Sequence, residues 1–278
     1  GPWVGTSYRG VNNCFIKLDA QDKRQVSALV QEINPTHIIL LSNLSGGVQY
    51  CEDNPEEAYK WHTQSTINVG KICAEKNIKL TYISTECVFD GSKEVCGEDE
   101  PYSPLSVYGE CKVKSEEWMK AHLDRFNIIR TMFVFGWQPE TVAPNALMRA
   151  YFLLQKGEEI PVQAYRWGAP TYANNLAEAI IELSLSENSG IFHVTGSDYM
   201  NRVEWLKQIF ENLKWDVSKI KPILGVPEKS LYPLKIRLNT DKFRSVCKTE
   251  LKSVSDILSE LEKEIALSKG KHEHATKN

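Results

Sequence analysis

Residues 80–112 restrict the fold of this chain more than any other stretch of it. Leu80 to Ile83 has the length and composition of a buried strand. Ser84, Thr85 and Glu86 follow directly, so polar side chains can project from the carboxyl end of that strand, the edge where open α/β sheets bind ligands. The acidic segment from Asp90 to Pro104, which contains Gly and Pro, is typical of a surface loop. The stretch therefore predicts a strand that ends at a binding edge.

A tyrosine and a lysine stand four residues apart in the helix expected to begin near Ser106. Tyr108 and Lys112 therefore project from one face of that helix. A nearby ammonium favours the phenolate, so the tyrosine can exchange a proton with a carbinol or carbonyl oxygen, which the hydroxyl of Thr85 can help to hold. The pair alone is also typical of an ordinary helix surface. The polar strand end upstream favours the functional arrangement.

Short strand patterns alternate with amphipathic helix patterns over the first 156 residues. The expected strands are Phe15–Asp19, His37–Leu41 and Asn127–Thr131, and the expected helices are Asp22–Ile33, Asn54 to about Lys76 and Asn145–Lys156. From about Gly157 the pattern changes to short strands, loops and helices, with a strand at 191–196 and a last helix over 254–266. Such alternation predicts an α/β protein built on a parallel sheet.

Composition excludes several classes of protein. The net charge of −3 does not favour nucleic acid or an anionic membrane as a partner. No apolar run is long enough to span a bilayer, and no signal peptide is recognised. The seven cysteines are scattered without metal-ligand spacing, which indicates free thiols in a reducing cytoplasm and no metal site.

Two ordered motifs carry a resemblance to a known family. The segments STECVFDG (84–91) and SPLSVYGECK (103–112) resemble those of the extended short-chain dehydrogenase/reductase superfamily, in the branch of dTDP-4-dehydrorhamnose reductase. The regulatory β subunit of methionine adenosyltransferase is nearly as similar. The resemblance runs from about Val4 to about Val246.

The resemblance implies a Rossmann-like, doubly wound parallel sheet with a smaller C-terminal α/β region for the substrate. Residues 1–156 would form the dinucleotide-binding domain and residues 157–268 mainly the substrate-binding region, with 191–196 returning to the sheet. Residues 269–278 are expected to be a disordered tail. The family's first strand and its Gly-x-x-Gly-x-x-Gly turn, which cradles the pyrophosphate, are not found in this sequence. We therefore expect either a sequence incomplete at its N-terminus or impaired binding of the dinucleotide.

The resemblance also implies the residues that contact the cofactor. Ser7 and Arg9 stand where the family places an acidic residue for the ribose, and a hydroxyl with a guanidinium suits a 2′-phosphate. NADP(H) is therefore preferred, and NAD(H) stays open. The residues expected at the cofactor are Ser7, Arg9, Asp19, Asn43, Ser84, Tyr108 and Lys112.

The resemblance places four further residues at the substrate: Glu86, Phe133, Trp167 and Gly168. Phe133 is equally typical of a core aromatic. His62 stands where family members carry an asparagine near the active site, and packing alone would account for it equally well.

Two functions follow from these expectations. In the first, the chain reduces a nucleotide-linked 4-keto-6-deoxy sugar with NADPH, and Thr85, Tyr108 and Lys112 are catalytic. In the second, the chain is a non-catalytic, NADP-binding regulatory or scaffold subunit that binds a partner enzyme. The missing glycine turn, His62 and Cys87 favour the second function, and the Thr85, Tyr108 and Lys112 set favours the first. Whether the chain forms a homodimer stays open.

Overall fold

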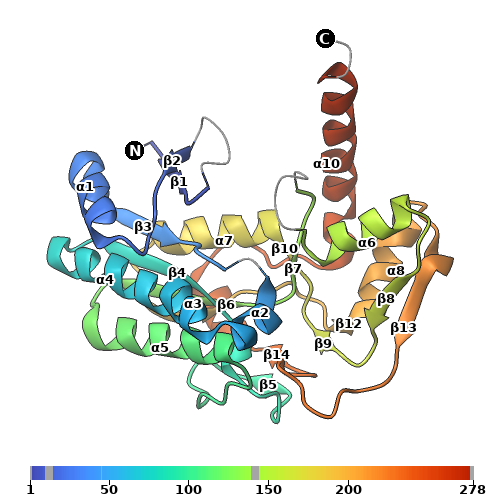
Figure 1. Ribbon diagram of the computed structural model, residues 1–278, viewed down its shortest axis with the longest axis horizontal. Coiled ribbons are helices and arrows are strands. Elements are labelled where there is room, and N and C mark those ends of the chain that lie inside the picture. The colour runs from blue at the N-terminus through green and yellow to red at the C-terminus, as the bar shows by residue number, and fades with distance from the viewer. Residues whose placement is uncertain (1, 10–14, 45, 139–143, 276–278) are drawn as a thin grey trace. The chain divides into compact units, whose positions relative to one another are not determined.

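The computed structural model describes residues 2–9, 15–44, 46–138 and 144–275. The chain divides into two compact units, and Figure 1 shows the order of their elements along the chain. Unit 1 comprises Gly1–Asp90, Pro101–Arg130 and Glu182–Phe192. Unit 2 comprises Gly91–Glu100, Thr131–Ile181 and His193–Asn278.

Unit 1 is built on a four-stranded sheet. Its strand order is β11-β6-β4-β3, and β3 and β4 run parallel with His37 opposite Lys79 and Leu40 opposite Tyr82. The first two strands of the chain, β1 and β2, form a separate parallel pair. The strands are β1 (Gly5–Ser7), β2 (Phe15–Lys17), β3 (His37–Leu40), β4 (Lys79–Thr85), β6 (Phe126–Thr131) and β11 (Gly190–His193). The predicted α/β class is confirmed, and the chain returns to the sheet at β11.

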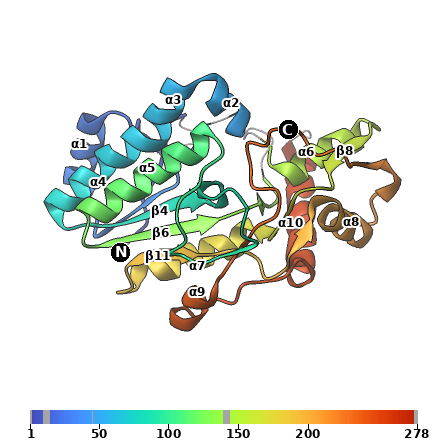
Figure 2. The ribbon, with the colours of Figure 1, turned by 90° about the horizontal axis from the view of Figure 1, so that it is seen from below.

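Helices α1, α4 and α5 lie along one face of strands β4 and β6 (Figure 2). Burial of apolar side chains between these helices and the strands drives their association. The helices of this unit are α1 (Lys23–Ile33), α2 (Gly47–Asp53), α3 (Pro55–Tyr59), α4 (Ser65–Lys76) and α5 (Val107–His122). Their core with the sheet consists of Val26, Val30, Leu40, Val69, Ile72, Cys73, Ile78, Leu80, Tyr82, Met119, Leu123 and Ile128.

Side-chain caps set the boundaries of α1 and α5. The carboxylate of Asp22 accepts hydrogen bonds from the backbone N–H groups of Arg24 and Gln25. Asn34 ends α1 in the left-handed conformation, at φ 47°, just before Pro35. The hydroxyl of Ser106 accepts from the N–H of Gly109 and begins α5.

The single helix expected from Asn54 to Lys76 consists of three segments. A π-helical turn, η1 (Lys60–Gln64), separates α3 from α4. Asn54 does not cap α3 through its side chain, because its Nδ2 donates to the carbonyl of Tyr50 at the end of α2. α3 therefore begins with Pro55 in its first turn and without a side-chain cap from Asn54.

A buried lysine at the start of β4 binds the end of α7 and the segment that follows it. The ammonium of Lys79 donates to the carbonyls of Leu183, Ser186 and Asn188 at distances of 2.6 to 2.9 Å. Those carbonyls lie at and just beyond the carboxyl end of α7 (Ala173–Leu185), where the helix leaves acceptors without partners. A cation is also favoured there by the helix dipole.

Unit 2 packs three helices around a second core. The helices are α6 (Ala146–Gln155), α8 (Arg202–Asn212) and α10 (Val254–Ala275), with the short α9 (Asp241–Val246) and the beginning of α7. The strand pairs are β7 (Val134–Phe135) with β10 (Thr171–Tyr172), β8 (Ile160–Gln163) with β13 (Ile220–Ile223), β9 (Trp167–Gly168) with β12 (Met200–Asn201), and β5 (Val95–Cys96) with β14 (Arg237–Leu238). The largest fully buried side chain of the described residues, Trp205, lies in this core.

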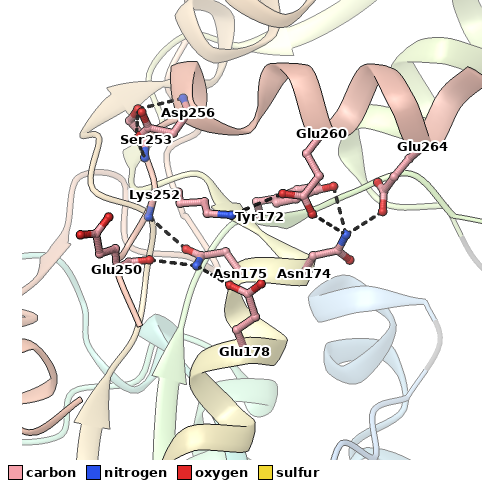
Figure 3. Close-up of polar contacts among 10 residues, drawn as sticks. All are labelled: Tyr172, Asn174, Asn175, Glu178, Glu250, Lys252, Ser253, Asp256, Glu260 and Glu264. Carbon is pink, nitrogen blue, oxygen red and sulfur yellow. Dashed lines mark hydrogen bonds and ion pairs between the residues drawn. The ribbon is translucent and has the colours of Figure 1, made fainter. Parts of the chain in front are cut away.

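Figure 3 shows how polar contacts hold α10 against the beginning of α7. The amide of Asn174 donates to Glu260 and Glu264 on successive turns of α10, at 3.0 and 2.7 Å. Asn175 donates to the carbonyl of Glu250 and accepts from the N–H of Lys252. These contacts fix the segment that leads into α10.

Two expected boundaries differ from the structure. Residues 131–156, expected in the first domain, belong to unit 2, because β7 pairs with β10 and α6 packs into the core of unit 2. The tail expected to be disordered from residue 269 continues α10 as far as Ala275, and residues 276–278 lie outside the described residues. Once a helix is formed, each further residue adds one backbone hydrogen bond, which extends the helix past its packed turns.

Candidate functional site

The candidate site in unit 1 is formed by the end of β4, the 3₁₀ turn η2 (Glu86–Val88) and the first turns of α5. Gly109 allows α5 to approach η2 closely. A Cβ atom at Gly109 would lie 2.3 Å from the carbonyl oxygen of Cys87, closer than real Cβ contacts occur. The absence of a side chain at this position therefore brings Tyr108 and Lys112 to the end of β4.

Lys112 is buried under the tyrosine that precedes it by one turn. Its side chain is 3% exposed, and its Nζ donates to the carbonyl of Ile83 at 2.9 Å. The same Nζ lies 4.6 Å from the ring centroid of Tyr82 and 5.7 Å from that of Tyr108. The carbonyl and the two rings replace part of the water that the ammonium loses on burial.

Tyr108 is half-buried and its phenol holds its proton tightly. Burial raises the pKa of Tyr108 well above its ordinary value, and the charges of Cys87 and Glu86 act in the same direction. A hydrogen bond with Thr85 opposes this shift of the pKa. The pKa was expected to fall because of the nearby ammonium, so the expected direction is wrong for the chain in this structure, where burial dominates.

Thr85 joins the tyrosine to the end of the strand. Its hydroxyl donates to Oε2 of Glu86 at 2.7 Å and accepts from the N–H of Cys87 at 3.2 Å. Together with its hydrogen bond to Tyr108, these contacts fix the hydroxyl in place. The structure therefore brings together Thr85, Tyr108 and Lys112, as the spacing along the chain predicted.

His62 lies against the same tyrosine, from the π-helical turn. Its side chain is 1% exposed and its ring centroid is 5.0 Å from that of Tyr108, edge to face. Burial, with the charge of Lys112, lowers the pKa of His62 to about 3, so the imidazole is neutral. Its Nε2 is 3.8 Å from Sγ of Cys51, and its Nδ1 has no hydrogen-bond partner among the described residues. π-Helical turns occur often at functional sites, and His62 is part of such a turn.

Ser84, expected at the cofactor, points into a buried polar network. Its hydroxyl donates to the carboxylate of Glu116, which also accepts from Tyr102 and forms an ion pair with Arg130 at 2.7 Å. Both members of the ion pair are at most 1% exposed. None of the motifs recognised in the sequence indicates this network. An arginine inside the apolar strand Asn127–Thr131 is the signal that could have found it, because a buried charge needs a partner.

The other residues expected at the cofactor lie at the carboxyl ends of strands. Ser7 ends β1, and Arg9 follows it with an exposed side chain. Asp19 follows β2 and accepts from the N–H of Gln21 at 2.9 Å. Asn43 is exposed beyond the end of β3. β1 and β2 run parallel, so their carboxyl ends lie at the same end of the pair. Ser7, Arg9 and Asp19 therefore lie at that end.

The residues expected at the substrate are divided between the units. Glu86 belongs to unit 1, and Phe133, Trp167 and Gly168 belong to unit 2. Phe133 has a positive φ of 51°, which is unusual for a residue with a side chain. Its ring lies 4.7 Å from that of Trp205 and 4.5 Å below the guanidinium of Arg202. Gly168 leaves room for Met132, whose Cε would lie 2.7 Å from an added Cβ.

Among the described residues, no group of three or more His, Cys, Asp or Glu side chains could hold a metal ion. No described helix is both long and apolar enough to cross a membrane. The six described cysteines, which exclude Cys14, carry thiols and not disulfides.

A parallel α/β sheet with a tyrosine and a lysine on one helix face, beside a threonine at a strand end, defines a Rossmann-like protein of the short-chain dehydrogenase/reductase type. The family model of the RmlD substrate binding domain matches residues 5–266, so the chain belongs to that family.

The relatives include proteins named for each of the two expected functions, a reductase and a regulatory subunit. A dTDP-4-keto-6-deoxy-D-glucose reductase of Streptomyces niveus is 27% identical over 77% of this chain and 75% of the relative. The methionine adenosyltransferase 2 subunit beta of Danio rerio is 25% identical over 81% of this chain and 70% of the relative. The crystal structure of dTDP-4-dehydrorhamnose reductase from Bacillus anthracis with NADP has a TM-score of 0.81 and 27% identity, covering 89% of this chain and 87% of that one.

Proposed function

We propose that the chain is an NADPH-dependent reductase of a nucleotide-linked 4-keto-6-deoxy sugar. The observation that carries this proposal is the meeting of Thr85, Tyr108 and Lys112 at the end of β4. Relatives named as reductases of such sugars and a similar structure that contains NADP support the substrate class and the cofactor.

The residues around Lys112 fit a dinucleotide. Its ammonium donates to a single carbonyl among the described residues, so N–H groups remain for the hydroxyls of a ribose. Arg9 and Ser7, at the end of β1, would donate hydrogen bonds to the 2′-phosphate that distinguishes NADP from NAD. Bound NADPH would supply the hydride that the carbonyl carbon of the sugar receives.

The chain's own residues would handle the proton and the oxygen. Tyr108 donates its phenolic proton to the oxygen of the ketone as that oxygen becomes a hydroxyl. The raised pKa of Tyr108 keeps the phenol protonated at neutral pH, which suits the direction of reduction. Thr85 holds the same oxygen by its hydroxyl, and Lys112 stabilises the negative charge that Tyr108 acquires.

The second candidate is a regulatory subunit that binds NADP without turnover. One observation favours it: the buried, neutral imidazole of His62 lies against the ring of Tyr108. The relatives named as subunits of methionine adenosyltransferase 2 support a partner enzyme in that case.

The deciding experiment measures binding and turnover separately on the full chain. NADPH binding is followed by fluorescence, and NADPH oxidation is then followed with a dTDP-linked 4-keto-6-deoxyhexose. Binding with turnover that requires the sugar nucleotide supports the reductase. Binding without turnover supports the regulatory subunit. If NADPH does not bind, both candidates are excluded.

A further inference from the structure

The π-helical turn η1, which carries His62, is bound to α5 through hydroxyl groups. The hydroxyl of Thr63 donates to the carbonyl of Cys111 at 2.9 Å. The hydroxyl of Ser115 lies 2.9 Å from that carbonyl and 2.9 Å from the carbonyl of His62, so it is shared between them. Thr66 also donates to the carbonyl of His62, at 2.7 Å. Because all of these side chains are buried, the backbone of η1 is fixed against the beginning of α5.

The imidazole of His62 lies between two helices. Its Nε2 is 3.8 Å from Sγ of Cys51 on α2. Its ring meets that of Tyr108 on α5 at 83°, with 5.0 Å between the ring centroids. Perpendicular aromatic rings at this separation attract each other, because the positive edge of one ring faces the negative surface of the other. The imidazole therefore connects the phenol ring of Tyr108 to η1 and α2.

The nitrogens of the imidazole contribute little to this arrangement. Nδ1 of His62 is buried and has no hydrogen-bond partner among the described residues. The thiol of Cys51 is a weak partner for Nε2. A buried nitrogen without a partner lowers the stability of the folded chain. The contact with Tyr108 therefore depends on the ring of His62 and not on its hydrogen bonds.

The imidazole also leaves the charge beside the phenol unchanged. Burial, with the charge of Lys112, lowers the pKa of His62 to about 3, so the ring is neutral at ordinary pH. The ammonium of Lys112 lies 5.7 Å from the ring centroid of Tyr108. A second cation beside it would repel it. The neutral ring of His62 can therefore support the phenol without opposing Lys112.

We propose that His62 is a positioning residue for Tyr108: the edge-to-face contact holds the phenol ring so that its hydroxyl stays hydrogen-bonded to Thr85. Without this contact the phenol can rotate about its side-chain bonds, away from the end of β4. The contribution of His62 to turnover rests on the proposed function. The position of the ring, in contrast, can be measured without turnover.

Fluorine NMR of the full chain, labelled with meta-fluorotyrosine, measures how the ring of Tyr108 is held. The resonance that is absent from Tyr108→Phe belongs to Tyr108, and its shift between light and heavy water increases with exposure to solvent. His62→Ala removes the supporting ring and should increase this solvent shift. His62→Phe keeps an aromatic edge and removes both nitrogens, so its solvent shift should stay close to that of the unmodified chain.

Steady-state kinetics with the sugar nucleotide test the same variants. We expect the kcat of His62→Ala to fall by about 10- to 100-fold, since a small displacement of a catalytic group costs up to that much. KM and NADPH affinity should stay nearly the same, because the substrate and the cofactor keep their own contacts. His62→Phe should recover most of kcat.

The matched control is His122→Ala. It removes an exposed imidazole at the end of α5, whose ring stacks on that of Trp118 with 4.6 Å between centroids. This variant also loses a contact between two aromatic rings, but at a position away from Tyr108 on the same helix. It should leave the fluorine resonance of Tyr108 and kcat unchanged.

A further variant protects the test against misfolding. His62→Leu fills most of the volume of the imidazole without an aromatic edge, and it should resemble His62→Ala in the solvent shift and in kcat. Thermal unfolding shows whether each variant is folded. An unchanged Tyr108 resonance in folded His62→Ala or His62→Leu would overturn the proposal. So would a folded His62→Phe that behaves like His62→Ala, because an aromatic edge would then not be what holds the phenol.

The two readouts separate this proposal from the proposed function. If His62→Ala exposes Tyr108 and the unmodified chain reduces nothing, the contact still holds the phenol and the reductase is excluded. If His62→Ala exposes Tyr108 and turns over at the normal rate, the reductase stands and His62 is not a positioning residue.

Discussion

The imidazole of His62 meets the ring of Tyr108 edge to face, with 5.0 Å between ring centroids. This contact comes from a π-helical turn on one side and from the first turn of α5 on the other. It places a neutral, buried base beside the phenol that the proposed reaction uses as an acid. The imidazole also excludes water from one side of the phenol, which is part of the burial that raises the pKa of Tyr108.

The first prediction concerns the phenol itself. Tyr108→Phe removes the proton donor and keeps the ring, so turnover should fall by about 100-fold or more while NADPH affinity stays nearly the same. Steady-state kinetics and fluorescence titration measure the two quantities. Tyr59→Phe, at an exposed tyrosine on α3, is the control and should keep full activity. Undiminished turnover in Tyr108→Phe would remove this residue from the mechanism.

The second prediction is an acid destabilisation caused by His62. The unfolded chain protonates this histidine near pH 6.5, and the folded chain only near pH 3. Between these values the unfolded state binds more protons, so the free energy of unfolding falls as the pH falls through this window. The slope contributed by one such group is at most about 1.4 kcal/mol per pH unit.

Urea unfolding at a series of pH values between 7 and 4 measures this slope. His62→Gln should show a shallower dependence on pH than the unmodified chain, whatever its stability at neutral pH. His122→Gln, at an exposed histidine of α5, should keep the original slope. Identical slopes in His62→Gln and the unmodified chain would mean that His62 is not held neutral in the folded state.

The third prediction concerns the buried ion pair of Glu116 and Arg130. Glu116→Gln leaves the guanidinium without its carboxylate in a position that is 1% exposed or less. Removing one partner of such a pair costs about 3–5 kcal/mol of unfolding free energy. Chemical denaturation measures the loss, and Glu117→Gln at the exposed neighbouring position should change stability by less than about 0.5 kcal/mol. A loss below about 1 kcal/mol in Glu116→Gln would contradict the assignment of this pair as buried.

The fourth prediction concerns the close approach of α5 to η2. In Gly109→Ala the new methyl group would lie 2.3 Å from the carbonyl of Cys87, so either the helix or the turn must move. Overpacking of this kind costs about 1–3 kcal/mol. Since η2 follows Thr85 directly, the displacement should also reduce turnover. Gly97→Ala, where an added Cβ meets no described atom within 4 Å, is the control for both measurements. Normal stability and turnover in Gly109→Ala would show that the approach is not required.

Local chemistry along the chain predicted much of the fold and the centre of the site. The helices expected at Asp22, Ser106 and Asn145 begin at those residues, because a side chain that satisfies the first N–H groups acts within one turn. The helical spacing of Tyr108 and Lys112 predicted their common face. Those inferences depend only on neighbours in the sequence.

The features that the sequence did not predict depend on tertiary packing. The π-helical turn at Lys60–Gln64 carries no propensity signal, since its extra residue is accommodated by the packing of α3 and α4. The hydroxyl of Ser84 turns to Glu116 because a buried carboxylate needs donors. The direction of the pKa shift of Tyr108 follows from burial, which spacing alone does not reveal.

The π-helical turn also makes this position tolerant of changes in chain length. A single-turn π segment accommodates one residue more than the α-helical path between the same two ends. Shortening the stretch from Lys60 to Gln64 by one residue would restore ordinary α-helical geometry, and Ala58 before it and Val69 after it would still face the core. The helix could thus lose a residue here without reorienting its flanks, and the imidazole beside Tyr108 is the part of the chain that such a deletion would displace.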